Sequence, residues 1–171
     1  MVFIKYILMF FILGTFILIG RLYAKKYENR LKELEEFDLL LNIFKAKIKF
    51  TSLGIQEIFN EIYENNKTNI GRIFKDASKL MNKETNIKAW ENAINKNKEN
   101  IYLNKEDIEA ICSLGKLLGN TDLEGQVSQI ELTKNLLKKQ IEEAKIEKNK
   151  NSKLYKTLGA TIGFTIVIIL M

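Results

Sequence analysis

Residues 123–171 read LEGQVSQIELTKNLLKKQIEEAKIEKNKNSKLYKTLGATIGFTIVIILM, and this stretch decides the fold. Its first half repeats apolar residues at intervals of three, four and seven, with lysine and glutamate between them. The repeating residues are Leu123, Val127, Ile130, Leu137, Ile141 and Ala144. This spacing predicts a long helix that buries one face against protein. From Leu154 onward almost every residue is apolar, which predicts that the helix continues into a membrane-spanning segment.

The first 20 residues form a second apolar run, in which Lys5 is the single charged side chain. About 20 helical residues cross a hydrocarbon core of roughly 30 Å. Four positive charges follow this run, at Arg21, Lys25, Lys26 and Arg30. A secretory signal peptide instead carries its charge ahead of the run and ends at a small-residue cleavage site. We therefore expect an uncleaved anchor, and a cleaved signal peptide is the alternative.

Lysines also precede the C-terminal apolar run. They are Lys145, Lys148, Lys150, Lys153 and Lys156. By the positive-inside rule, the region between the two runs faces the cytoplasm and both termini face outward. Residues 158–171 span only about 21 Å as a helix, so this segment either crosses with help from Leu154 or dips into the bilayer. We expect it to cross. The expected organisation is a transmembrane helix at 1–21, a cytoplasmic helical domain at 22–153 and a second transmembrane helix at 154–171.

The region between the anchors reads as a series of amphipathic helices, and the chain contains no proline to break them. Apolar stripes at helical spacing occupy residues 27–48, 55–62, 70–81, 87–94 and 108–118, and a sixth stripe begins after Asp122. Asn104 is a strong start signal for the fifth helix, and Thr85 or Asn86 is expected to cap the fourth. We expect an all-α fold, an antiparallel bundle of about six helices between the two transmembrane helices.

Gly159 and Gly163 lie four residues apart in the C-terminal run and therefore share one helix face. In lipid, helices associate where small residues let their backbones approach closely. One reading is that this face packs on the first apolar run near Gly14, or on another subunit. The other reading is that glycine is simply common in membrane helices.

Few residues in the sequence suggest catalysis. The chain has no histidine, which is the commonest general base and metal ligand. Its single cysteine, Cys112, lies on an apolar helix face, so we expect a buried structural thiol. No Walker or Rossmann glycine loop is present. The net charge of +6 fits nucleic acid, but much of it flanks the apolar runs. We expect no enzyme, no cofactor, no metal site and no nucleic-acid partner.

Two stretches resemble stage III sporulation protein AB of endospore-forming bacteria. The first carries the motif residues Leu118, Gly119, Asp122 and Gln126, and the second is the tail from Asn149 through Gly163 and its aliphatic end. The stretch around Trp90 and the lone N-terminal span are similar as well. The chain departs from that family at residues 52–53, which read Ser-Leu where a proline is common, and this departure touches only a loop.

The resemblance implies a membrane component of the channel-like apparatus that links mother cell and forespore, placed in the mother-cell (outer forespore) membrane. It also implies a soluble domain similar to the cytoplasmic domains of type II secretion inner-membrane protein F. The implied partners are other membrane subunits of the stage III sporulation complex, a cytoplasmic secretion-type ATPase, the lipid bilayer and a possible second copy of the chain. No catalytic or cofactor residue carries over. The alternative is a membrane-anchored helical adaptor or regulator unrelated to secretion.

Overall fold

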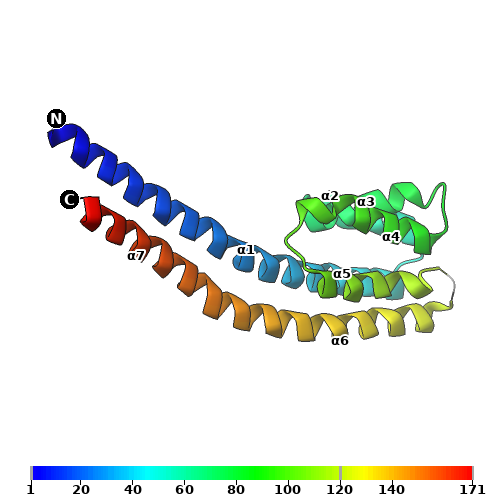
Figure 1. The fold of residues 1–171 in the computed structure, drawn as a ribbon. Coiled ribbons are helices and arrows are strands. Elements are labelled where there is room, and N and C mark those ends of the chain that lie inside the picture. Colours follow the sequence, from blue (N-terminus) through cyan, green and yellow to red (C-terminus); the bar gives the residue numbers. More distant parts are fainter. Residues whose placement is uncertain (1, 120, 171) are drawn as a thin grey trace. The chain divides into compact units, whose positions relative to one another are not determined.

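The computed structural model describes residues 2–119 and 121–170, and helices make up most of both ranges (Figure 1). The predicted all-α class is confirmed. The chain divides into two compact units: unit 1 contains Met1–Leu31 and Glu143–Met171, and unit 2 contains Lys32–Glu142. These limits reflect packing within the chain and therefore do not test the predicted membrane boundaries at residues 21 and 153. The membrane boundaries stay predictions.

Long helices form both ends of the chain, and shorter ones lie between them (Figure 1). The α-helices are α1 (Val2–Phe50), α2 (Ile55–Asn65), α3 (Asn69–Leu80), α4 (Asn86–Asn97), α5 (Lys105–Cys112), α6 (Leu123–Glu147) and α7 (Lys153–Leu170). Two 3-10 segments, η1 (Lys98–Asn100) and η2 (Ser113–Leu117), and one π-helix, η3 (Lys148–Ser152), connect some of them. Within unit 2, the described residues form six α-helical stretches, which agrees with the predicted number.

The core of unit 2 is an aromatic cluster to which four helices each contribute a fully buried ring. The rings are Phe37 of α1, Phe59 of α2, Phe74 of α3 and Trp90 of α4. The centroid of the Trp90 ring lies 5.3 Å from that of Phe74 and 5.5 Å from that of Phe59. The indole N–H of Trp90 donates to the carbonyl oxygen of Ile111 at 3.0 Å, so the buried ring leaves no polar atom unpaired. The cluster therefore holds α1 to α4 together.

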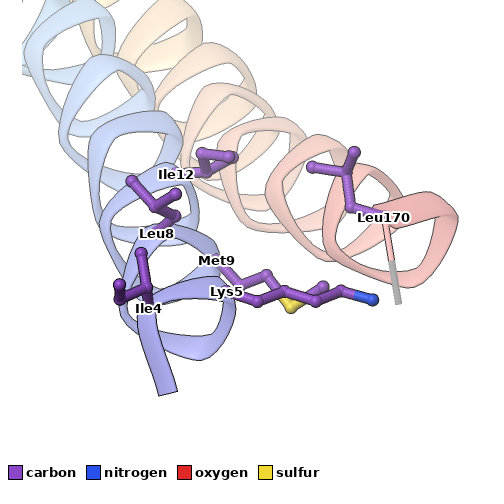
Figure 2. A pocket seen from close by; sticks show the side chains of 6 residues that line it. All are labelled: Ile4, Lys5, Leu8, Met9, Ile12 and Leu170. Atoms are coloured by element: carbon purple, nitrogen blue, oxygen red, sulfur yellow. The ribbon is translucent and has the colours of Figure 1, made fainter. Parts of the chain in front are cut away.

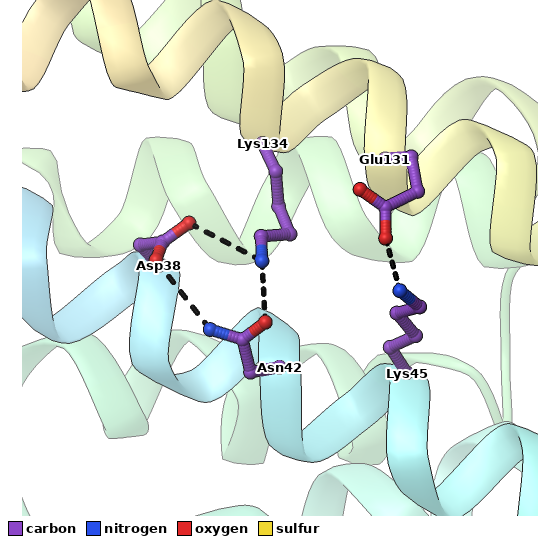
Figure 3. Close-up of polar contacts among 5 residues, drawn as sticks. All are labelled: Asp38, Asn42, Lys45, Glu131 and Lys134. Carbon is purple, nitrogen blue, oxygen red and sulfur yellow. Dashed lines mark hydrogen bonds and ion pairs between the residues drawn. The ribbon is translucent and has the colours of Figure 1, made fainter.

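Polar side chains also join α1 and α6 within unit 2 (Figure 3). Lys45 of α1 pairs with Glu131 of α6. Lys134 of α6 contacts Asn42 and, at 3.9 Å, the carboxylate of Asp38. Lower-numbered residues of α1 meet higher-numbered residues of α6, so the two helices run antiparallel. Because partly exposed ion pairs are worth only about 0–1 kcal/mol each, these contacts help to fix the register rather than supply the stability.

The predicted apolar stripe of α6 is confirmed over most of its length, since Ile130, Leu137, Ile141 and Ala144 are buried. The prediction is wrong at Leu123, whose side chain is 48% exposed. This leucine occupies the first position of α6, before the turns whose buried face packs in the core.

Two polar residues, Gln129 and Thr133, lie on the buried face of α6 between the apolar ones. The side-chain amide of Gln129 donates to the carbonyl oxygen of Ser113 in η2 at 2.6 Å, and the hydroxyls of Thr133 and Ser113 lie 3.0 Å apart. Around Gln129 and Thr133, α6 therefore contacts η2 through hydrogen bonds between buried polar groups instead of through apolar side chains. Spacing alone could not reveal this, because the partner residue lies in another segment.

The helix start at Asn104 is confirmed. Its side chain accepts the N–H of Asp107 at 2.8 Å, and the Asp107 carboxylate accepts the N–H of Asn104 at 2.9 Å. The fifth helix is shorter than predicted, because the α-helix ends at Cys112 and continues as η2. Gly115 within that segment lowers helix propensity. Thr85 occupies the cap position of α4 without a side-chain hydrogen bond.

Replacing Leu137 by alanine should destabilise unit 2 by about 2–5 kcal/mol, because a fully buried leucine leaves a cavity. Leu136→Ala is the matched control: that side chain is 42% exposed, so we expect a change within about 0.5 kcal/mol. The single tryptophan, Trp90, is buried in unit 2, so its fluorescence can follow denaturant unfolding of the detergent-solubilised full chain. Equal, small effects of the two substitutions would contradict the buried α6 face.

Candidate functional site: the glycine contact between α1 and α7

Two helical stretches, Phe3–Phe50 and Leu123–Leu170, are long and apolar enough to cross a membrane by length and composition. Only 11% of the apolar window in each stretch is buried inside the chain. Large apolar side chains such as Phe10 and Ile169, both 77% exposed, find no cover within unit 1. A core helix of a soluble protein would bury most of such a window.

Within unit 1, α1 and α7 run antiparallel (Figure 1). They touch through the backbones of two glycines. Gly159 of α7 is buried, and a Cβ added to it would lie 2.6 Å from the carbonyl oxygen of Phe16 and 3.0 Å from the Cα of Gly20. Conversely, a Cβ on Gly20 would lie 2.5 Å from the carbonyl oxygen of Tyr155. Any side chain at either glycine would therefore push the two helices apart.

Gly163 continues the same contact one turn further along α7. A Cβ added there would lie 2.9 Å from the Cδ1 atom of Leu13 and 3.3 Å from the Cβ of Phe16. The predicted neighbour Gly14 is not part of the contact, because a Cβ on it would meet no atom within 4 Å. Gly14 lies on another face of α1, and Gly20 is the α1 glycine that contacts α7.

The π-helix η3 sets the rotation of α7. Ala144, Ser152 and Gly159 are all buried, and eight residues separate the first two where two α-helical turns would take about seven. A π turn takes about one residue more than an α turn, because its hydrogen bonds join residues five apart. The π turn absorbs the extra residue, so Ala144 at the end of α6 and the glycines of α7 lie on the same side of the helix within unit 1. The sequence showed only a weakened pattern at Asn149 to Ser152.

Beyond the glycines, the contact between α1 and α7 becomes aromatic and then charged. The ring of Tyr155 stacks between Tyr23 and Tyr27, with centroid distances of 5.6 and 5.9 Å. The carboxylate of Glu28 accepts hydrogen bonds from Lys156 at 2.7 Å and Ser152 at 2.8 Å. These bonds, led by the one from Lys156, hold the pKa of Glu28 below its ordinary value. This sequence of contacts, apolar then aromatic then ionic, matches the change from hydrocarbon to headgroup to water in a bilayer.

Arg30 extends the ionic contacts, since its guanidinium donates to the Glu147 carboxylate at 2.7 Å. The Arg30 side chain is only 7% exposed, so this pair is largely shielded from solvent on the arginine side. It ties the last α-helical turn of α6 to α1 within unit 1. Arg30 and Lys156, two of the charges from which we predict the membrane orientation, therefore also form ion pairs between the two ends of the chain.

The opposite end of the pair has an apolar pocket, drawn in Figure 2. It is lined by Ile4, Lys5, Leu8, Met9, Ile12 and Leu170. Lys5 is the one charged residue among them, so the pocket lacks the converging polar groups that catalysis needs.

The family motif residues come together in one turn of unit 2 with a structural role. Leu118 is buried, and its carbonyl oxygen accepts a hydrogen bond from the Asn86 side chain at 3.3 Å. Gly119 has φ +72°, a left-handed conformation that favours glycine. The Asp122 carboxylate accepts the N–H of Gly125 at 2.9 Å and caps α6. Gln126 donates to the carbonyl oxygen of Thr121 at 3.1 Å. These contacts shape the connection into α6.

Two isolated groups have a shifted pKa, Cys112 and Glu33. Cys112 is half-buried, where the sequence predicts a buried thiol. Burial raises the pKa of this thiol, and the negative charges of Glu91 and Glu109 raise it further. The raised pKa disfavours the nucleophilic thiolate. Burial raises the pKa of Glu33 to about 7, although its carboxylate accepts the Tyr102 N–H at 2.5 Å. Among the described residues, no three His, Cys, Asp or Glu side chains gather as metal ligands would.

A family model described as stage III sporulation protein AB matches residues 5–171. The chain belongs to the stage III sporulation protein AB family. The resemblance inferred from the motif and the tail is thus confirmed, and the matched residues include both apolar helices.

Individual relatives agree with this assignment. Stage III sporulation protein AB of Bacillus subtilis (strain 168) is 24% identical over 150 residues, which cover 86% of this chain and 88% of the relative. A solved structure of stage III sporulation protein AB superposes with a TM-score of 0.65 at 19% identity, and the match covers 70% of this chain and 95% of that one. The structural likeness supports the fold.

Replacing Gly159 and Gly163 together by leucine should separate α1 from α7, because each added side chain collides with α1. Overpacking typically costs about 1–3 kcal/mol per site, so the midpoint of thermal aggregation in detergent should fall by about 5 °C or more. Thr161→Leu with Thr165→Leu is the matched control, with the same spacing and the same new side chains at exposed positions of α7. An equal shift for both pairs would contradict the glycine contact.

Proposed function

We propose that the chain is a non-enzymatic membrane platform subunit of a secretion-like complex that acts at stage III of sporulation. In this proposal α1 and α7 cross the membrane of the mother cell around the forespore, and unit 2 lies in the cytoplasm. Its partners are other membrane subunits of the complex and a cytoplasmic secretion-type ATPase, and unit 2 acts like the cytoplasmic domains of type II secretion inner-membrane protein F.

The observation that carries the proposal is the extent of the family match. It spans residues 5–171, so the similarity to sporulation proteins includes both apolar helices as well as the helical region between them. The antiparallel pairing of α1 and α7 supports two crossings, because α7 alone offers a short apolar segment and the glycine contact gives it a partner in lipid.

A scaffold role is favoured because buried polar groups of unit 2 form hydrogen bonds within the protein. Gln129 and Thr133 bond to Ser113 of η2, and Asp107 caps the start of its own helix. The family description names a sporulation stage and no reaction. A simple coiled-coil adaptor is the second candidate, but the aromatic cluster around Trp90 is a compact core that such an adaptor does not need.

Deleting the gene should block spore formation, and single-cysteine variants in a Cys112→Ser background should restore it. Lys67 is exposed in unit 2 and Phe3 is 85% exposed near the other end of α1. In intact cells an impermeant thiol reagent should label Phe3→Cys and spare Lys67→Cys until the membrane is opened.

Ready labelling of Lys67→Cys in intact cells would reverse the proposed orientation. Normal spore yield without the gene would remove the sporulation role itself. Phe3→Cys serves as the control for reagent access, because a reagent that reaches neither cysteine says nothing about sidedness.

A further inference from the structure

Two adjoining grooves lie where the charged part of unit 1 meets the apolar helix α7. One is lined by Glu28, Lys148, Asn149, Ser152, Lys153, Lys156 and Thr157. The other is lined by Lys150, Lys153, Leu154, Thr157 and Leu158. Lys153 and Thr157 line both, so the grooves form one continuous surface, called here the lysine groove.

The lysine groove carries excess positive charge. Glu28 is its one carboxylate, and that charge is already compensated by the 2.7 Å ion pair with Lys156. Lys148, Lys150 and Lys153 have no acidic partner within 4 Å among the residues that the structure describes. All three lysines line the groove and can attract an anion from outside the chain, although Lys148 also acts electrostatically on Glu28.

The π-helix brings two of these lysines into the same groove. Residues five apart in an α-helix lie on different faces, whereas a π turn closes between residues five apart. Lys148 is the first residue of η3 and Lys153 directly follows its last residue, and both line the first groove. The irregular turn that orients the glycines thus also places two lysines along one groove.

Apolar surface continues directly from this charge. Leu154 and Leu158 line the second groove and are 48% and 44% exposed. We propose that the lysine groove binds one anionic phospholipid, with its phosphate between Lys148 and Lys153, the Thr157 hydroxyl donating to it, and an acyl chain along Leu154 and Leu158. The inference rests on the proposed membrane location of α7.

The combination of features favours a phospholipid over a small anion. Inorganic phosphate would gain from the lysines and nothing from the leucines. A phospholipid gains from both, and the groove lies at the start of the apolar run, where the headgroups of a bilayer would lie.

The test uses the full chain in detergent, titrated with phosphatidylglycerol or with phosphatidylcholine of the same acyl chains, and counts bound lipids by native mass spectrometry. The wild-type chain should saturate at one phosphatidylglycerol and bind phosphatidylcholine much more weakly. Lys148→Gln with Lys153→Gln should weaken phosphatidylglycerol binding about thirtyfold. Lys25→Gln with Lys26→Gln removes the same charge from α1 outside the groove and should leave binding within about twofold.

Equal weakening in both pairs would mean a diffuse surface charge and would overturn the site, as would displacement of the lipid by millimolar inorganic phosphate. Carbonate extraction of membranes separates this inference from the proposed function. A wild-type chain released by carbonate would refute the membrane location. A chain that resists carbonate but retains no phosphatidylglycerol would refute the lipid site alone.

Discussion

The close approach of two backbones at Gly20 and Gly159 is the contact on which unit 1 depends. In lipid, apolar side chains gain little by leaving one helix surface for another, so helix pairs need close packing or polar contacts to associate. The glycines supply the first, and the pair of Glu28 with Lys156 and Ser152 supplies the second. The glycine contact and the Glu28 hydrogen bonds lie along the same face of the antiparallel helix pair, so rotating α7 about its axis would break both.

Unit 2 is held together by a different force. Its stability comes from burial of apolar and aromatic surface around Trp90, and its polar contacts mainly fix register. The motif from Leu118 to Gln126 is part of this structural role, since it shapes the turn and cap that start α6.

Much of this organisation follows from the sequence because it is periodic. The stripes on α1 and α6, the capping pair Asn104 and Asp107 and the apolar ends were all readable from spacing and residue type. Three features were not. Leu123 has the spacing of the stripe but lies before the turns of α6 that pack in the core. The residues that bond to Ser113 lie 16 and 20 positions away in the chain. Whether Gly20 or Gly14 contacts α7 depends on how the two helices are rotated relative to each other. Each depends on tertiary placement, which local periodicity does not encode.

Within unit 1, the π turn of η3 takes up one extra residue, so the glycines of α7 keep facing α1. Deleting Asn149 would leave seven residues between Ala144 and Ser152, which a regular α-helix fits in two turns with the same face toward α1. Inserting one alanine after Asn149 instead adds a residue that the turn does not absorb, so every later residue should turn by about 100°. Spin labels at Leu18 and Ile162 in a Cys112→Ser chain, measured in lipid nanodiscs, report the pairing of α1 and α7. We expect one narrow distance distribution in the parent and in the deletion, and a broad one in the insertion. A broad distribution in the deletion, or an unchanged narrow one in the insertion, would contradict a π turn that sets the rotation of α7.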